Sequence, residues 1–267
     1  MEVINSFSQR AKLGSFNPNR IVVKEGHDMN ITVIHGSPRK GNTYEITQKF
    51  MQEMQTKGEV TFREFFLPKD MPEFCKGCFT CILRDEKSCP HASYIQPILS
   101  AMLEADALIF TTPVYVLSAS GAMKTFLDHF GFMFYIHRAR PEMFHKKAFI
   151  LSTTAGAGTK SAMNVIATSL KYWGINRVYQ RGFVMHSIKW DSMPPEKINR
   201  YEKHLRADAA KFWDAVSSKK DCTPYLHTRF MVFMIKQFQK HQADDSVDKL
   251  YWKAQGWLDD VSPFQSK

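Results

Sequence analysis

Short apolar runs alternate with amphipathic stretches along most of this chain. The apolar runs predict strands at 31–35, 59–66, 106–112, 146–153 and 177–184. Apolar residues at helical spacing predict helices at 43–56, 93–104, 119–132, 160–173 and 195–216. The segments Leu108-Ile109-Phe110 and Phe149-Ile150-Leu151 are continuously apolar, as strands buried on both faces require.

Strands that alternate with helices in this way predict an α/β fold, a doubly wound five-stranded parallel sheet. Right-handed crossovers restrict the strand order to a few topologies, and 2-1-3-4-5 is among them. We expect this sheet domain to span residues 29–217. Residues 1–28 are polar and weakly patterned, so we interpret them as an N-terminal arm.

Residues 218–267 break the alternation and form a C-terminal tail. Lys219-Lys220-Asp221 is typical of a linker, and two helices are expected after it, at 226–240 and around 245–258. The tail is too small to fold alone. We therefore expect this helical extension to pack on the sheet domain or on a second subunit of a homodimer or larger homo-oligomer. A membrane-surface helix fits less well, because its charged face is modest and its apolar run is short.

The loop after the first predicted strand, residues 36–43, has the composition of an anion site. It offers backbone N–H groups at the start of a helix, side-chain donors from Ser37, Asn42 and Thr43, and a cation from Arg39. An asparagine stands where a Walker A loop needs lysine, and the two glycines are too far apart for a dinucleotide loop. A monophosphate is the better fit, and an ordinary polar turn is the alternative.

Two further loops follow predicted strands, and ligands in such sheets bind at the carboxyl ends of the strands. Residues 113–118 offer a stiff proline and the flat ring of Tyr115, and Ser118 or Ser120 can cap the next helix. Residues 153–158 are small enough for backbone N–H groups to approach a ring edge. Together the three loops suit an isoalloxazine ring. Each alone can also be a plain connection or tight turn.

Three motifs resemble a known family: residues 36–43, then Pro113-Val114-Tyr115, then residues 123–128 (Met-Lys-Thr-Phe-Leu-Asp). They resemble NAD(P)H-dependent FMN reductases and iron–sulfur flavoproteins of flavodoxin-like fold, over roughly residues 29–190. The resemblance implies FMN, with its phosphate at Ser37, Arg39, Asn42 and Thr43. It implies that Pro113, Val114, Tyr115 and Ser118 line the ring and ribityl region, and that Thr154, Ala155, Gly156 and Gly158 face the ring edge.

Four cysteines, Cys75, Cys78, Cys81 and Cys89, form a second pattern. Thiolates at such spacing can converge on a soft metal centre, although the last gap is longer than in bacterial ferredoxins. One interpretation is a [4Fe–4S] cluster that exchanges electrons with FMN, as in the resembled iron–sulfur flavoproteins. A structural zinc ion and a metal-free loop beside the flavin are the others. Cys222 is expected to be an ordinary thiol.

Composition narrows the class of protein. The chain has 267 residues, 44% of them hydrophobic, and no apolar run that suits a membrane span or a signal peptide. Bunched cysteines favour a reducing cytoplasm over a secreted disulfide framework. The net charge is +10, and residues 138–217 hold 14 Lys/Arg against 6 Asp/Glu. No basic tract or reader motif accompanies this excess, so no nucleic-acid partner is predicted.

The three loops and the family resemblance together imply an FMN-dependent oxidoreductase that takes a hydride from NAD(P)H and reduces a small-molecule acceptor: a quinone, a nitro or azo compound, or a flavin. An alternative is an electron carrier that relays electrons between a [4Fe–4S] cluster and FMN, with ferredoxin as a partner. A redox sensor with a zinc-held loop is a third class. No side chain is assigned as an acid or base. Tyr115 is the candidate for ring stacking or substrate positioning.

Overall fold

The structure, a computed structural model, describes residues 29–175, 177–187, 189–218 and 224–264. The predicted N-terminal arm, the linker residues 219–221 and Cys222 lie outside these ranges.

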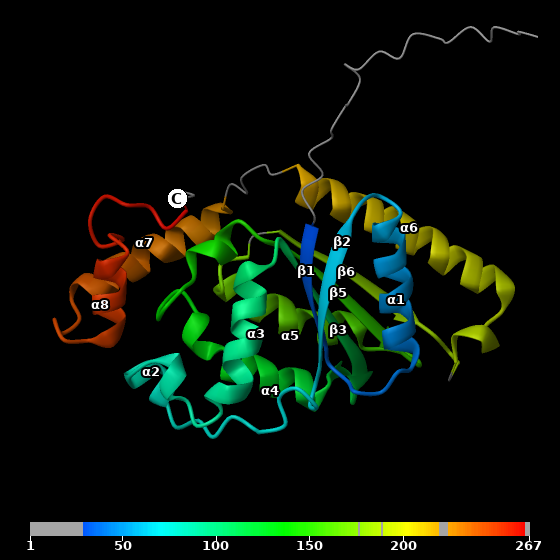
Figure 1. The fold of residues 1–267 in the computed structure, drawn as a ribbon, viewed down its shortest axis with the longest axis horizontal. Helices are drawn as coiled ribbons and strands as arrows, with labels where there is room; N and C mark the ends of the chain where they lie inside the picture. Colours follow the sequence, from blue (N-terminus) through cyan, green and yellow to red (C-terminus); the bar gives the residue numbers. More distant parts are fainter. Residues whose placement is uncertain (1–28, 176, 188, 219–223, 265–267) are drawn as a thin grey trace, which may run out of the picture.

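Five long parallel strands form the centre of the molecule (Figure 1). They are β1 (Met29–His35), β2 (Val60–Phe66), β3 (Ala107–Tyr115), β5 (Lys147–Thr154) and β6 (Arg177–Val184), in the order β2-β1-β3-β5-β6. The predicted order 2-1-3-4-5 is confirmed, because β5 and β6 are the fourth and fifth long strands. The short strand β4 (Ser118–Ala119) pairs antiparallel with the end of β3.

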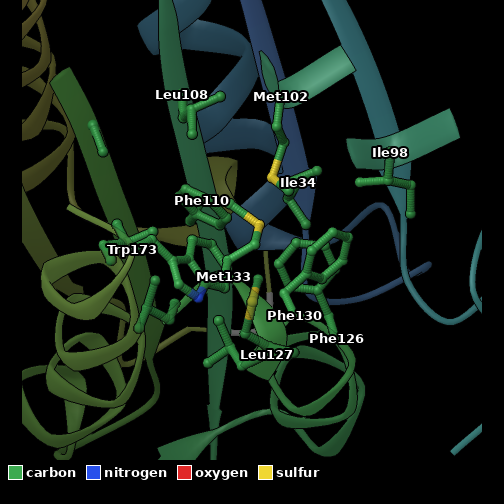
Figure 2. Close-up of a cluster of buried hydrophobic side chains, with 14 of the residues drawn as sticks. Ile34, Ile98, Met102, Leu108, Phe110, Phe126, Leu127, Phe130, Met133 and Trp173 are labelled. Atoms are coloured by element: carbon green, nitrogen blue, oxygen red, sulfur yellow. The ribbon is translucent and has the colours of Figure 1, made fainter. Parts of the chain in front are cut away.

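Helices cover both faces of the sheet, as the doubly wound prediction requires (Figure 1). On one face lie α1 (Asn42–Gln55) and α6 (Pro195–Ser217), and on the other lie α3 (Ala92–Glu104), α4 (Gly121–His129) and α5 (Thr159–Tyr172). Side chains alternate across β3, so Leu108 and Phe110 face the second set while Ala107 and Ile109 face the first. Figure 2 shows Phe110 near Trp173 and Met133 in the hydrophobic core between the sheet and the helices α3, α4 and α5.

The connection after β3 differs from its prediction. Residues 113–115 continue β3 instead of forming a loop, and with β4 they make a hairpin. The helix predicted at 119–132 begins at Gly121, because the Ser120 hydroxyl accepts the N–H of Met123 at 3.2 Å and caps it. It ends at His129, before the 3₁₀ turn η2 (Gly131–Met133). The remaining short elements are α2 (Thr80–Leu83), η1 (Glu86–Ser88), η3 (Pro141–Phe144) and η4 (Trp190–Ser192).

The tail helices α7 (Leu226–Lys240) and α8 (Val247–Ala254) lie at one end of the molecule (Figure 1). Their apolar side chains form a third core with the segment 135–144 of the sheet domain. Trp252 and Trp257 are buried in it, against Tyr135 and Phe144. One face of α7 stays exposed, including Phe230 and Phe233. Among the helices that the structure describes, none combines the length and apolar character that crossing a membrane requires.

Candidate active site

A cavity of about 270 Å³ lies at the carboxyl edge of the parallel sheet. Nine of the predicted site residues line it: Ser37, Arg39, Asn42, Thr43, Pro113, Val114, Tyr115, Thr154 and Ala155. The three loops that the sequence singles out therefore meet at one site, as the carboxyl-edge rule for such sheets predicts.

Gly36 fixes the predicted anion loop, residues 36–43, against the sheet. Its N–H donates to the Thr111 carbonyl at 2.6 Å, and its carbonyl accepts the Ser120 hydroxyl at 2.5 Å. A Cβ at this position would lie 2.8 Å from the Thr111 oxygen, so a larger residue would push the loop off β3. The loop thus lies against the sheet because it begins with glycine.

The first turn of α1 supplies the anion-binding end of this loop. No side chain caps the helix at Gly41, so the N–H groups of its first turn lack the usual capping acceptor among the described residues. Arg39 lies beside Gly41, with its Nε 3.5 Å from the position that a Cβ there would take. A helix N-terminus with a guanidinium next to it attracts an anion such as a phosphate.

Asn42 and Thr43 join the loop to the neighbouring strands. Thr43 shares a 2.5 Å hydrogen bond with the Thr153 hydroxyl at the end of β5. Asn42 donates from Nδ2 to the Ser187 carbonyl at 2.9 Å. Its Oδ1 is buried and has no hydrogen-bond partner among the described residues. An unpaired buried acceptor is costly, so this oxygen is suited to accept from a ligand hydroxyl.

Three predicted residues do not line the cavity: Ser118, Gly156 and Gly158. Ser118 pairs with Tyr115 in the hairpin, and Gly156 donates its N–H to the Thr154 hydroxyl at 3.3 Å. Gly158 has φ +98°, and a Cβ there would lie 2.9 Å from Val114 and 3.0 Å from the Leu117 backbone. These residues shape the hairpin and its neighbouring loop.

Four lining residues were not assigned individually: Gly41 and Thr153, which lie in two of the predicted loops, and Met185 and Ser187, which the sequence interpretation missed. Met185 and Ser187 follow β6, at the same carboxyl edge as the three predicted loops. The strand predicted at 177–184 already places them there, so applying the edge rule to this last strand would have identified them.

His35, the last residue of β1, directly precedes the anion loop 36–43 and is 2% exposed. Its Nε2 is 2.8 Å from Glu64 Oε2, and its ring stacks on Phe66 at 4.4 Å. The hydrogen bond from His35 is the largest cause that lowers the pKa of Glu64 below its usual 4.5. His35 therefore braces β1 against β2.

The cysteine loop, residues 75–89, follows β2 and contains α2 and η1 (Figure 1). Cys75 and Cys78 are exposed, whereas Cys81 and Cys89 are half-buried against the core. Burial is the main cause that raises the pKa of the Cys81 thiol, and the other three thiols raise it further. Within residues 29–264, as far as they are described, no three His, Cys, Asp or Glu side chains are grouped to hold a metal ion.

Comparison with known proteins identifies the family to which the chain belongs. The sequence model of NADPH-dependent FMN reductase matches residues 29–189. An iron–sulfur flavoprotein of Archaeoglobus fulgidus is 31% identical over 158 residues, which is 58% of this chain and 69% of that protein. One of Clostridioides difficile is 29% identical over 238 residues, covering 85% of this chain and 99% of its own.

Solved structures confirm the flavodoxin-like architecture. An azoreductase from Bacillus anthracis superposes with a TM-score of 0.53 at 16% identity, over 70% of this chain and 99% of the azoreductase. Identity this low shows the fold alone, whereas the family match covers more than half of the sequence. The chain therefore belongs to the NADPH-dependent FMN reductase family and is an FMN-dependent oxidoreductase that uses NAD(P)H.

Proposed function

We propose that the cavity at the carboxyl edge is the FMN site. The observation that carries this assignment is the uncapped start of α1, with Arg39 beside it, at the rim of the cavity. Ser37, Arg39, Asn42 and Thr43 would hold the phosphate, together with the N–H groups of the first helical turn. The buried, unpaired Oδ1 of Asn42 suits a ribityl hydroxyl. These features fit FMN.

The ring would lie along the other two sides of the cavity. Pro113, Val114 and Tyr115 provide an apolar wall, and Thr154 and Ala155 belong to the opposite loop. FMN, when bound, supplies the hydride and electron-transfer chemistry of the reaction. The chain would provide position and exclude water, and we assign no side chain as an acid or base. Ser118, Gly156 and Gly158 would act by shaping the hairpin and loop.

The proposed acceptor is a small molecule, such as a quinone, a nitro or azo compound, or a flavin. The hairpin that borders the cavity is open to solvent, because Tyr115 is 49% exposed and Val116 is 98% exposed. An acceptor can therefore reach this side of the site from solution. A cytoplasmic location and a homo-oligomer are part of the same proposal.

A second candidate function is electron transfer through a [4Fe–4S] cluster on Cys75, Cys78, Cys81 and Cys89, with ferredoxin as a partner. It is favoured by the four interacting thiols on one loop and by the iron–sulfur flavoproteins to which the chain is similar. The donor chemistry suits a cluster. In the described conformation the four thiols are not grouped closely enough to hold a metal ion. Cluster binding would therefore require the loop to rearrange. Zinc and free thiols remain the alternatives.

Arg39→Ala tests the FMN site, with Lys40→Ala as its matched control. Both variants remove one cation, but the Lys40 ammonium lies over the Tyr44 ring. Losing a charged hydrogen bond to phosphate is expected to weaken FMN binding about tenfold, whereas Lys40→Ala should bind FMN like the wild type. Riboflavin, which lacks the phosphate, should bind both variants alike. Fluorescence titration of the flavin-free protein measures these affinities. Equal FMN affinity in the two variants would contradict the assignment.

Anaerobic purification separates the two functions. A yellow protein whose flavin is bleached by NADPH alone supports the reductase. A brown protein that contains iron and sulfide, and whose flavin NADPH alone does not bleach, supports the electron carrier.

A further inference from the structure

Segment 136–140 lies between the cysteine loop and the tail helices. The tail donates hydrogen bonds to three of its carbonyls. Gln239 Nε2 donates to Ile136 at 2.6 Å, Trp252 Nε1 donates to His137 at 2.9 Å, and the Tyr251 hydroxyl donates to Ala139 at 2.5 Å. The tail therefore fixes the backbone of this segment through side chains of both α7 and α8.

The Arg138 side chain continues the connection from this segment to the cysteine loop. Arg138 is only 4% exposed. Nη1 donates to the Ile82 carbonyl in α2 at 3.1 Å and to Asp248 Oδ1 in α8 at 2.9 Å. Nε lies 3.8 Å from Glu86 Oε2 in η1. One buried guanidinium thus joins two elements of the cysteine loop to the tail.

Neighbouring groups reinforce both ends of this connection. Arg140 Nη2 donates to Glu86 Oε1 at 2.5 Å, and His137 Nδ1 lies 2.7 Å from Asp248 Oδ2. The two carboxylates are therefore each shared between residues of segment 136–140. In addition, α2 lies directly beside α8 (Figure 1). A buried cation that lost these partners would be strongly disfavoured, so the arrangement favours one loop conformation.

Arg138 also lies close to the thiols. Its Nη1 donates to the carbonyl of Ile82, the residue that follows Cys81 in α2. Its Nη2 atom is buried and has no hydrogen-bond partner among the described residues. A donor left free in this way is available to a thiolate sulfur.

We propose that Arg138 is a positioning residue through which the C-terminal helices hold the cysteine loop. The tail thereby determines how the four thiols are presented. This role goes beyond the proposed function, because it is the same whether the loop binds a cluster, binds zinc or keeps free thiols. FMN binding and the Arg39→Ala result do not bear on it.

Hydrogen exchange of the full-length protein, read by mass spectrometry, tests this role. Asp248→Asn keeps the shape of the side chain and removes the charge that pairs with Arg138, and Arg138→Met removes the guanidinium. In both variants we expect the amides of residues 80–89 to exchange about tenfold faster or more, while those of β1 and β3 stay as in the wild type. Asp244→Asn is the matched control, since this fully exposed tail carboxylate pairs with Lys249 instead of Arg138.

Two results distinguish positioning from a general contribution to stability. Arg138→Lys keeps the charge but has one donor group in place of a planar fork, so the loop should exchange at an intermediate rate. Iodoacetamide should label Cys81 and Cys89 faster in Asp248→Asn than in Asp244→Asn. Unchanged loop exchange in Asp248→Asn would overturn the proposal. So would equal acceleration in β1 and β3, which indicates loosening of the whole fold.

Discussion

Val116 and Leu117, at the tip of the β3–β4 hairpin, both adopt left-handed backbone conformations. Their φ angles are 49° and 59°. Such angles are unfavourable for residues with a Cβ, and most of all for a β-branched residue such as valine. Both side chains point into solvent, with Val116 98% exposed and Leu117 63% exposed. Little packing therefore offsets the strain of this turn.

Replacing the pair by Asn-Gly, the residues that a two-residue hairpin turn of this shape prefers, should stabilise the protein. We expect Val116→Asn/Leu117→Gly to raise the free energy of unfolding by about 1–2 kcal/mol. Urea denaturation measures the change. Val261→Asn, a substitution of another exposed apolar residue, should give no comparable gain. A double variant that is no more stable than the wild type would mean that the turn is not strained.

The same turn shows what sequence alone cannot provide at the residue scale. Val-Leu contains none of the residues that mark a two-residue turn, so the hairpin within the predicted loop 113–118 could not be identified from the sequence. The anion loop was predictable, because Gly36, Ser37 and Arg39 carry their chemistry in their residue types. Arg138 and Asp248 were not, because an ion pair between residues 110 positions apart depends on tertiary packing.

At the scale of elements, β1 and β2 are joined across the sheet by the pair His35–Glu64. Because the pKa of Glu64 is lower in the folded protein than in the unfolded chain, its carboxylate form is the stabilised one. This stabilisation is complete above the unfolded pKa. It is lost as the pH falls through the folded pKa, where the carboxylate becomes protonated in both states.

Glu64→Gln should therefore lower the free energy of unfolding at neutral pH, and the difference from the wild type should shrink as the pH falls below about 4. Urea denaturation of both proteins between pH 7 and pH 3 measures this difference. Glu73→Gln, a substitution at an exposed position, is the control. It should leave the free energy of unfolding unchanged at both neutral and low pH. A difference that stays constant over this range would show that the carboxylate charge contributes nothing.

The apolar pattern predicted most of the strands and helices, because the spacing of apolar residues in each one indicates which of its faces is buried. It did not predict α2, with four residues, or the 3₁₀ turns. A single turn is too short to show a periodic apolar pattern. The cysteine loop, which contains two of these short elements, was accordingly predicted only as a set of ligands, without a fold.

At the scale of the whole molecule, the tail has two different faces. One face supplies Trp252 and Trp257 to a core that also buries Tyr135 and Phe144. The other leaves Phe230 60% exposed and Phe233 56% exposed. The first face is bound within the chain. The second is free among the described residues and is the natural place to test whether the tail contacts a second subunit.

Two variants separate these roles. Truncation after Ser217 removes both faces and exposes Tyr135 and Phe144, so we expect aggregation or a much lower melting temperature; burial of a single tryptophan is already worth about 3–5 kcal/mol. Phe230→Ser/Phe233→Ser alters only the exposed face. It should keep the wild-type melting temperature, because neither ring is buried in the chain. If the tail also joins subunits, light scattering should show a smaller assembly for this double variant at an unchanged melting temperature. A truncated protein that stays soluble with an unchanged melting temperature would show that the third core does not support the sheet domain.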